Sequence, residues 1–206
     1  MKIISIEGNI GSGKSTFLKL LKENVKDVYF LDEPVEQWDT IKDECGKTIL
    51  ENYYSDPKKY SFSFQMMAYI SRLSLLRQAI QSNKYNIIIT ERCLYTDKNV
   101  FCKMLYDDTM ISVMDYTIYN KWFEEFTGLM DNIYYIYLKT DPQIAEKRIL
   151  HRNRKGETIK LEYLIRCNDY HDNWLNNTKN VTTIDANENE INMKPWLNIV
   201  KKLMSE

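Results

Sequence analysis

The stretch GNIGSGKST, residues 8–16, contains the residue types that surround a nucleotide's phosphates. It fits the pattern GxxxxGK[ST], in which glycines let backbone N–H groups turn inward around an anion beside a helix N-terminus. Lys14 can reach the outer phosphates, and the hydroxyl of Ser15 suits Mg²⁺. A glycine turn of purely structural purpose is the alternative. The pattern predicts a phosphate site, but it leaves open whether the protein is a switch, a motor or a transferase.

Two acidic residues stand where predicted strands end. The run NIIITER ends in Glu91 and Arg92, and LDEPVEQW places Glu33 directly before a proline. Ligands of α/β sheets collect at the carboxyl ends of the strands, so these side chains should face the phosphate loop. Glu91 can hold Mg²⁺ or its waters, Arg92 can clamp phosphoryl oxygens, and Glu33 can accept a proton from an acceptor hydroxyl. A surface ion pair and an acidic turn before a helix are the alternatives.

A cluster of cations lies in the segment EKRILHRNRKGE. Arg148 and Arg152 are four residues apart and share a helix face, and Arg154 follows in the loop. These residues can simply complement the helix dipole. The other interpretation is a lid, over about residues 152–158, whose arginines close on a transferring phosphate and neutralise its charge.

Short apolar runs predict the strands that must position these groups: 2–6, 28–31, 86–90, 133–138 and 181–184. Helical periodicity covers 15–25, 57–80, 115–126, 142–151, 160–175 and 190–204. Strands that alternate with helices predict a doubly wound α/β sheet. Since no repeat or long linker divides the chain, we expect a single domain over residues 1–206.

Composition argues against several classes of protein, including nucleic-acid binders, disulfide-rich proteins and membrane proteins. The 206 residues carry 28 basic and 29 acidic side chains, so no basic field marks a nucleic-acid binder. The four cysteines stand apart without a CxxC pair, which indicates free thiols. No run approaches the roughly 18 apolar residues of a membrane span, and the N-terminus lacks the pattern of a signal or transit peptide. We expect a cytoplasmic protein that binds neither nucleic acid nor membrane.

Two functional classes use such a phosphate loop. A GTPase-type switch needs the guanine-reading pattern N-K-x-D, but the Asn-Lys pairs here continue as NKYN and NKWF. The stretch DECG matches D-x-x-G without following a strand. A small-molecule kinase needs an acceptor pocket, a base and a cationic lid, and the chain offers candidates for all three. The sequence therefore favours a kinase.

Eight blocks follow one another in an order and at a spacing typical of one family: IEGNIGSGKST, DEPVEQW, YSDPKKYSFSFQMMAYISR, ERCLYTDKNVF, DYTIYNKWF, RILHRNRKGE, LEYL and DANEN. In these blocks the chain resembles the deoxyribonucleoside kinase family, in its deoxycytidine/deoxyguanosine kinase-like branch. The resemblance implies a P-loop kinase fold, with a five-stranded parallel sheet flanked by helices and an arginine-rich lid. It also implies a homodimer, for which the helices around 60–76 and 115–126 are candidate interfaces or plain core.

The resemblance further implies transfer of the γ-phosphoryl group of ATP, or of another nucleoside triphosphate, to the 5′-hydroxyl of a deoxyribonucleoside. The implied catalytic residues are Glu33, Glu91 and Arg92. Glu33 would accept or orient the proton of the hydroxyl, although some accounts of the family give the base role to Glu91. Ser15 and Glu91 would serve Mg²⁺. Arg92 would bind the 5′-oxygen and phosphate region. The implied ATP-binding residues are Gly8, Asn9, Ile10, Gly11, Ser12, Gly13, Lys14, Ser15, Thr16, Arg148, Arg152, Arg154, Glu188, Asn189 and Glu190.

For the acceptor, the resemblance places Tyr54 and Glu157 at the 3′-hydroxyl and Gln65 at the edge of the base, where an amide can both donate and accept. The whole implied substrate-binding set is Glu33, Trp38, Tyr54, Phe64, Gln65, Arg72, Arg92, Asp97, Phe101 and Glu157. Phe64 falls beside the base. Trp38 and Phe101 are either walls of the pocket or plain core.

Base preference rests on Ala68, Arg72 and Asp97. In the family, an Arg and an Asp at the last two positions accompany cytosine and purine substrates, whereas apolar residues accompany thymidine. Asp97 can accept from an exocyclic amine, and the small Ala68 leaves room in the pocket. A structural ion pair between Arg72 and Asp97 is the alternative. We expect deoxycytidine first, the deoxypurines close behind and thymidine last.

The main alternative is a nucleoside monophosphate kinase of the thymidylate type, which shares the phosphate loop, the sheet and the lid. Such an enzyme binds an acceptor phosphate, which calls for an added cation near the acceptor. Here that neighbourhood consists of Glu33 and uncharged or aromatic residues. The chain departs from the family pattern at Cys93, where serine is common, and at Gly156, where the lid often has another acid. Neither change removes a reacting group.

Overall fold

A computed structural model describes residues 1–130, 132–154, 157, 159–188 and 193–205. Its five strands form one parallel sheet in the order β2-β3-β1-β4-β5. They are β1 (Lys2–Glu7), β2 (Tyr29–Leu31), β3 (Ile87–Glu91), β4 (Ile133–Lys139) and β5 (Val181–Asp185). Each predicted strand is present, with its ends displaced by at most one residue. The α/β prediction is therefore confirmed.

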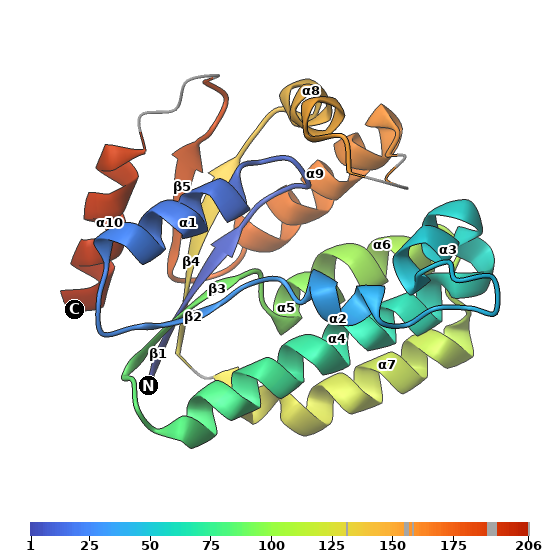
Figure 1. Ribbon diagram of the computed structural model, residues 1–206, viewed down its shortest axis with the longest axis horizontal. Helices are drawn as coiled ribbons and strands as arrows, with labels where there is room; N and C mark the ends of the chain where they lie inside the picture. The colour runs from blue at the N-terminus through green and yellow to red at the C-terminus, as the bar shows by residue number, and fades with distance from the viewer. Residues whose placement is uncertain (131, 155–156, 158, 189–192, 206) are drawn as a thin grey trace.

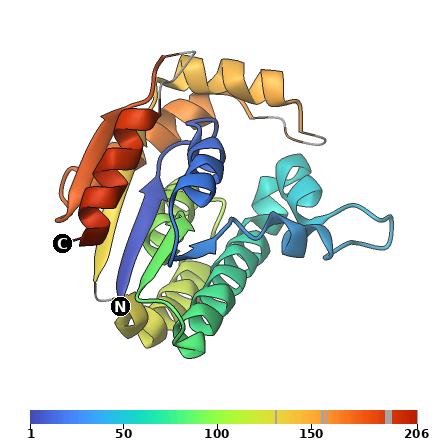
Figure 2. The ribbon, with the colours of Figure 1, turned by 60° about the vertical axis from the view of Figure 1, so that its left-hand side comes forward.

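Helices cover both faces of the sheet (Figures 1 and 2). One face carries α1 (Lys14–Asn24) and α10 (Lys194–Ser205). The other carries α4 (Pro57–Ser82), α7 (Val113–Phe126) and α9 (Leu161–Leu175). In both views α8 (Pro142–Arg152) lies above the carboxyl ends of the strands. The predicted start of the last helix, at 190, falls outside the described residues.

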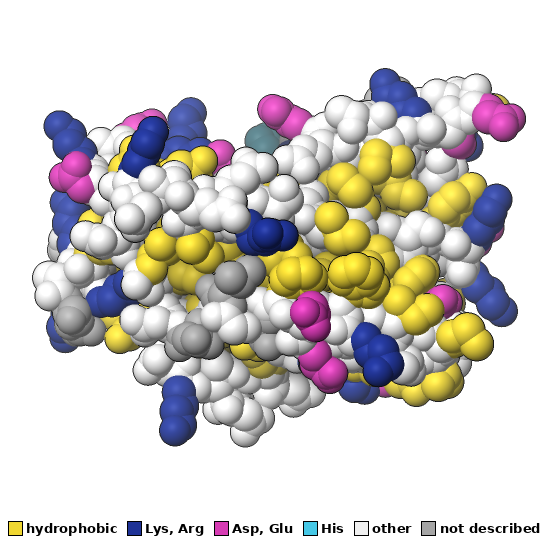
Figure 3. All heavy atoms as spheres, turned by 90° about the horizontal axis from the view of Figure 1, so that it is seen from below, with side chains coloured by type: hydrophobic (Ala, Val, Ile, Leu, Met, Phe, Trp, Pro, Cys, Tyr) yellow, Lys and Arg dark blue, Asp and Glu magenta, His cyan; other side chains and the backbone are white. Residues whose placement is uncertain are grey.

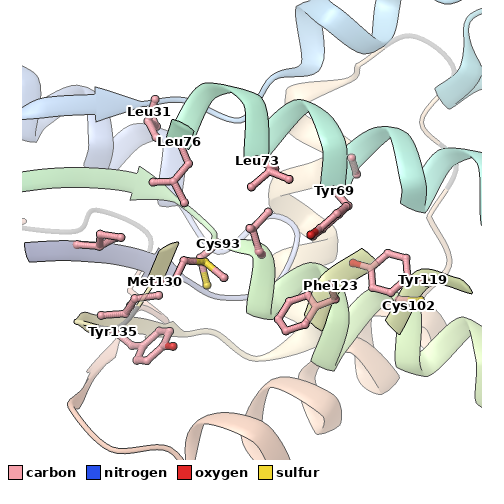
Figure 4. Close-up of a cluster of buried hydrophobic side chains, with 14 of the residues drawn as sticks. Leu31, Tyr69, Leu73, Leu76, Cys93, Cys102, Tyr119, Phe123, Met130 and Tyr135 are labelled. Carbon is pink, nitrogen blue, oxygen red and sulfur yellow. The ribbon is translucent and has the colours of Figure 1, made fainter. Parts of the chain in front are cut away.

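Alternation along the strands divides the core into two clusters. On β1, Ile4 and Ile6 pack with Phe17 of α1 and Trp196 of α10, whereas Ile3 joins the opposite cluster. Figure 4 shows that opposite cluster, where Leu73 and other residues of α4 meet residues of α7 and the sheet. Successive side chains of a strand point to opposite faces, so the continuous apolar run of β1 serves both clusters.

Hydrophobic periodicity in the sequence does not predict several short elements, because each is too short to show a repeat of 3.6 residues. They are α2 (Val35–Asp39), α3 (Ile49–Ser55), α5 (Leu94–Thr96), a π-helical segment (Asp97–Cys102), α6 (Lys103–Asp107) and a 3₁₀ turn (Thr127–Met130). Caps set the start of α3 and α4. Thr48 and Glu51 form a capping box at the start of α3. At the start of α4, the side chain of Asp56, the residue directly before Pro57, accepts the N–H of Lys59.

Parallel register brings the ends of the central strands together. Ile6 of β1 lies opposite Glu91 of β3, so the phosphate loop and the Glu-Arg pair emerge side by side. All four cysteines are free thiols, as predicted. Within the described ranges, no helix combines the length and apolar character that a bilayer crossing requires.

Candidate active site

A cavity of about 940 Å³ lies among the segments that follow β1, β2 and β3. It brings together, from many segments of the chain, the whole predicted acceptor set, namely Glu33, Trp38, Tyr54, Phe64, Gln65, Arg72, Arg92, Asp97, Phe101 and Glu157. Parts of the predicted donor set line the same cavity, namely Ile10, Gly11, Gly13, Lys14, Ser15, Thr16, Arg148, Arg152 and Arg154. A nucleoside and a triphosphate can therefore meet in one space.

The phosphate loop has a backbone that only glycine allows at two positions. Gly8 has φ +144° and Gly11 has φ +80°, and an added Cβ would lie 2.6 Å from the Leu138 carbonyl oxygen and 2.5 Å from that of Ala145, respectively. Asn9 and Ser12, two further residues of the loop, are buried and do not line the cavity. These residues support the loop.

Lys14 is folded back onto the loop. Its Nζ donates to the Asn9 carbonyl oxygen at 2.7 Å. Burial, helped by the nearby Arg92 guanidinium, lowers the pKa of Lys14 to about 7, although the carboxylates of Glu91, Glu33 and Glu7 oppose the shift. A polyanion at the loop would supply the negative charge that this ammonium group needs.

Ser15 and Glu91 meet at the mouth of the loop, as predicted for residues that follow neighbouring strands. The Ser15 hydroxyl donates to Glu91 Oε1 at 2.9 Å. A hydroxyl and a carboxylate oxygen at this distance are both ligands that a hard cation prefers. Within the described residues, no three or more His, Cys, Asp or Glu side chains form a cluster that could hold a metal ion.

Glu33 lies between two guanidinium groups. Arg92 Nη1 donates to Glu33 Oε1 at 2.6 Å, and Arg72 Nη2 lies 3.5 Å from the same oxygen. Burial is the largest single influence and favours the neutral acid, but Arg92, Arg72 and Lys14 together outweigh it and lower the pKa of Glu33 to about 2. Glu33 is therefore ionised and can accept a hydrogen bond from an acceptor hydroxyl.

Arg92 itself has a left-handed backbone, with φ +61°. Such a conformation costs about 1–3 kcal/mol in a non-glycine residue and persists only where the surroundings enforce it. Here the Arg92 N–H donates to the Ile6 carbonyl at 3.0 Å, and the Thr90 hydroxyl donates to the Arg92 carbonyl at 2.6 Å. The guanidinium lies over the ring of Phe101, 4.9 Å from its centroid.

Arg72 and Asp97 form a buried ion pair. Arg72 Nε donates to Asp97 Oδ2 at 3.0 Å, and Arg72 Nη1 donates to the Glu91 carbonyl at 2.6 Å. Burial raises the pKa of Asp97, and the adjacent guanidinium opposes the rise. Nearby, Gln65 is 3 % exposed, and its Oε1 has no hydrogen-bond partner in the described part of the chain. An unpaired buried amide oxygen at the cavity wall is suited to a ligand's donor.

Aromatic rings form the walls of the acceptor region. Trp38 packs edge-on against Phe64, and Phe64 stacks on Tyr53 with 4.9 Å between ring centroids. Trp38 Nε1 is satisfied by the Ser71 hydroxyl at 3.0 Å, so this ring is both core and wall. Burial raises the pKa of Tyr54, and the Glu157 carboxylate adds to the rise, so these two predicted sugar contacts lie near each other.

The lid arginines differ in their contacts. Arg152 Nη2 pairs with Glu157 at 2.6 Å, and the Glu157 side chain is only 3 % exposed. Arg148 Nη2 donates to the Glu188 carbonyl at 2.8 Å, whereas its Nη1 is buried without a partner in the described residues. The predicted donor residues Asn189 and Glu190 lie outside the described ranges.

Comparison with known proteins accounts for this combination of loop, acids and arginines. A sequence model of the deoxynucleoside kinase family matches residues 4–205. The chain belongs to the deoxynucleoside kinase family. It is therefore an ATP-dependent nucleoside kinase, and the predicted P-loop kinase fold is confirmed.

Individual relatives agree with the family assignment. The chain is 41% identical over 179 residues to a probable deoxycytidine kinase of fowlpox virus, covering 84% of this chain and 72% of the relative. It is 33% identical over 205 residues to the mitochondrial deoxyguanosine kinase of Xenopus laevis, covering 89% and 76%. It is 32% identical over 196 residues to human deoxycytidine kinase, covering 85% and 75%.

Sequence reasoning missed some residues of the site. Tyr163 and Tyr53 line the cavity with their hydroxyl oxygens 3.2 Å apart. Tyr163 belongs to the LEYL block, which carried the family resemblance but no assigned role. Met193 and Lys194, at the start of α10, also line the cavity and had no local pattern to identify them.

Proposed function

We propose that this kinase phosphorylates the 5′-hydroxyl of deoxycytidine or a deoxypurine in preference to thymidine. The observation that carries the proposal is the Arg72–Asp97 pair beside the unpaired Gln65 Oε1 in the cavity wall. Cytosine, adenine and guanine each carry an exocyclic amine that these acceptors can bind, whereas thymine carries none. Thymine would present a carbonyl oxygen to a carboxylate instead, which is repulsive.

In the proposed mechanism, Glu33 orients the 5′-hydroxyl and receives its proton as the phosphoryl group leaves the donor. Because the transition state of phosphoryl transfer is loose, little deprotonation is needed before the transfer. A carboxylate whose pKa is about 2 in the empty site is then adequate as an acceptor. Arg92, 2.6 Å from Glu33, stabilises the phosphoryl oxygens together with the lid arginines.

We infer that the donor is ATP or another nucleoside triphosphate with Mg²⁺ held by Ser15 and Glu91, which the 2.9 Å hydroxyl–carboxylate contact supports. The ion would screen the charge of the phosphates. Lys14 and the loop amides bind those phosphates. We further propose one kinase domain over residues 1–206 with a lid at about 152–158, of which residues 155, 156 and 158 lie outside the described residues. We expect a cytoplasmic location for this protein, whereas one of its relatives is a mitochondrial enzyme.

We also propose a homodimer through α4 and α7. Five large apolar side chains are exposed on these helices: Ile70, Val113, Met114, Ile118 and Trp122. Figure 3 views the molecule from the side on which α4 and α7 lie and shows hydrophobic side chains gathered there. An exposed apolar face of this kind marks an interaction site, and a second copy of this chain is the partner that we propose for it.

The test of base preference compares kcat/KM for the four deoxynucleosides at fixed ATP and Mg²⁺. Deoxycytidine or a deoxypurine should exceed thymidine, and Asp97→Asn should lower that ratio by about tenfold or more, since the amide can no longer act as a pure acceptor. A preference for thymidine in the unaltered protein contradicts the proposal. Faster phosphorylation of the monophosphates than of the nucleosides would instead favour the thymidylate-type alternative.

The role of Glu33 has its own test. Glu33→Gln keeps the shape of the side chain but cannot take the proton, so kcat should fall by about 10²-fold or more. Turnover close to that of the unaltered protein would move the role to Glu91.

A further inference from the structure

Glu7, the last residue of β1, has a buried carboxylate that the proposed mechanism does not use. The residue is fully buried. Its carboxylate accepts the hydroxyl of Ser5 at 2.6 Å and the hydroxyl of Thr96 at 2.8 and 2.7 Å to its two oxygens. Burying a carboxylate is costly unless donors satisfy it, so these hydroxyl groups determine where the Glu7 side chain can lie.

Thr96 links this carboxylate to the corner between β3 and α5. Its hydroxyl oxygen also accepts the backbone N–H of Cys93 at 3.1 Å. A hydroxyl has a single proton, so it gives that proton to Glu7 while a lone pair receives the Cys93 N–H. Glu7 thereby fixes the orientation of the hydroxyl that holds the residue directly after Arg92.

The corner contains the strained residue of the site. Arg92 has φ +61°, a region that a bulky non-glycine residue adopts only when its neighbours hold it there. On the N-terminal side, the Arg92 N–H donates to the Ile6 carbonyl, whereas the Arg92 carbonyl, on the C-terminal side, accepts the Thr90 hydroxyl. On the C-terminal side, the Cys93 N–H is held through Thr96. The peptide that joins Arg92 to Cys93 is thus held at both of its polar groups, by Thr90 at the carbonyl and by Thr96 at the N–H.

We propose that Glu7 and Thr96 form a clamp that positions Arg92 for catalysis. The carboxylate, acting through the threonine hydroxyl, holds the β3–α5 corner in the left-handed conformation that directs the guanidinium to Glu33, 2.6 Å away, and toward the phosphate loop. This inference rests on the proposed place of Arg92 at the transferring phosphate. Glu7 and Thr96 touch no reacting group and are positioning residues.

The experiment compares three variants of the full-length protein. Thr96→Val keeps the shape of the side chain and removes the hydroxyl, whereas Thr96→Ser keeps the hydroxyl. Ser5→Ala is the matched control, because it removes the other hydroxyl that donates to the same carboxylate but does not touch the corner. Initial rates with deoxycytidine and ATP give kcat and KM for each, and thermal unfolding gives Tm.

Thr96→Val should lower kcat by about tenfold or more with KM for the nucleoside within about threefold, because misplacing a catalytic group by a fraction of an ångström costs rate rather than ground-state binding. Thr96→Ser and Ser5→Ala should keep kcat within about twofold, although Ser5→Ala lowers Tm. The proposal is overturned by any of three results: Thr96→Val keeps the kcat of the unaltered protein, Thr96→Ser shows the same loss of kcat as Thr96→Val, or Ser5→Ala loses as much kcat as Thr96→Val.

If Thr96→Val does not fold, Glu7→Leu tests the link from the other end. Leucine keeps a side chain of similar size at this buried position and removes the acceptor of the Thr96 hydroxyl, so the same loss in kcat of about tenfold is expected. A kcat within about twofold of the unaltered protein overturns the clamp. Failure of the proposed function is separate, since the unaltered protein would then phosphorylate no deoxynucleoside.

Discussion

At pH 8 the protein should bind a nucleoside triphosphate more weakly than at pH 7, because Lys14 loses its proton in this range when the site is empty. Burial, with help from Arg92, lowers the pKa of Lys14 to about 7. The phosphates of the donor favour the charged ammonium, so donor binding raises that pKa and takes up a proton. Affinity is therefore lost as the pH rises through the pKa of the free protein.

The size of the effect follows from the fraction of protein with charged Lys14. The apparent Kd rises in inverse proportion to that fraction, which gives about a fivefold rise from pH 7 to 8 and about a ninefold rise from pH 8 to 9. The rise ends where the pKa of the bound form is reached. The donor's own titration contributes little to this change in Kd, since the second pKa of its terminal phosphate is about 6.

Isothermal titration calorimetry between pH 7 and 9, with Mg²⁺ and a non-hydrolysable donor analogue, measures this Kd. Runs at pH 8 in buffers of different ionisation enthalpy should show uptake of close to one proton, about 0.9. Lys14→Arg is the control, because a guanidinium stays charged over the whole range and should remove the pH dependence. A Kd that changes by less than about twofold across this range would refute the reasoning. It would show that Glu91, Glu33 and Glu7 outweigh burial.

Three further predictions concern stability and assembly. Burial lowers the pKa of His171 to about 3. Below about pH 6.5 the unfolded chain therefore takes up a proton that the folded protein does not, and the free energy of unfolding should fall by up to about 1.4 kcal/mol per pH unit. Denaturant titrations at pH 6 and pH 4 should show a smaller fall in the His171→Phe variant than in the unaltered protein. Gly11→Ala places a Cβ 2.5 Å from the Ala145 carbonyl at φ +80°, so Tm should fall and donor binding should weaken; an unchanged Tm contradicts this. Trp122→Glu, at a side chain that is 49% exposed, should convert the proposed dimer to a monomer in sedimentation analysis, whereas Lys121→Glu should not; a Trp122→Glu dimer argues against this interface.

Local patterns were enough to predict most of the fold. Strands, long helices and the phosphate loop are properties of short stretches, and the strand ends shifted by no more than a residue. The position of Glu33 and Glu91 could also be predicted, because in a parallel sheet the residues that follow the strands share one edge. Short elements such as α2 and α5 could not, since they span less than two helical turns.

By itself, the sequence determined a phosphate loop, because nine consecutive residues contain the whole pattern, and it supplied the residue types that favour a kinase. Only the tertiary structure decided which of those residues meet. Ser15 and Glu91 are 76 positions apart, and Glu7 and Thr96 are 89 apart, yet each pair shares a hydrogen bond. Such contacts depend on strand register, on the left-handed turn at Arg92 and on burial. Local periodicity encodes none of these, because all three arise when distant segments pack together.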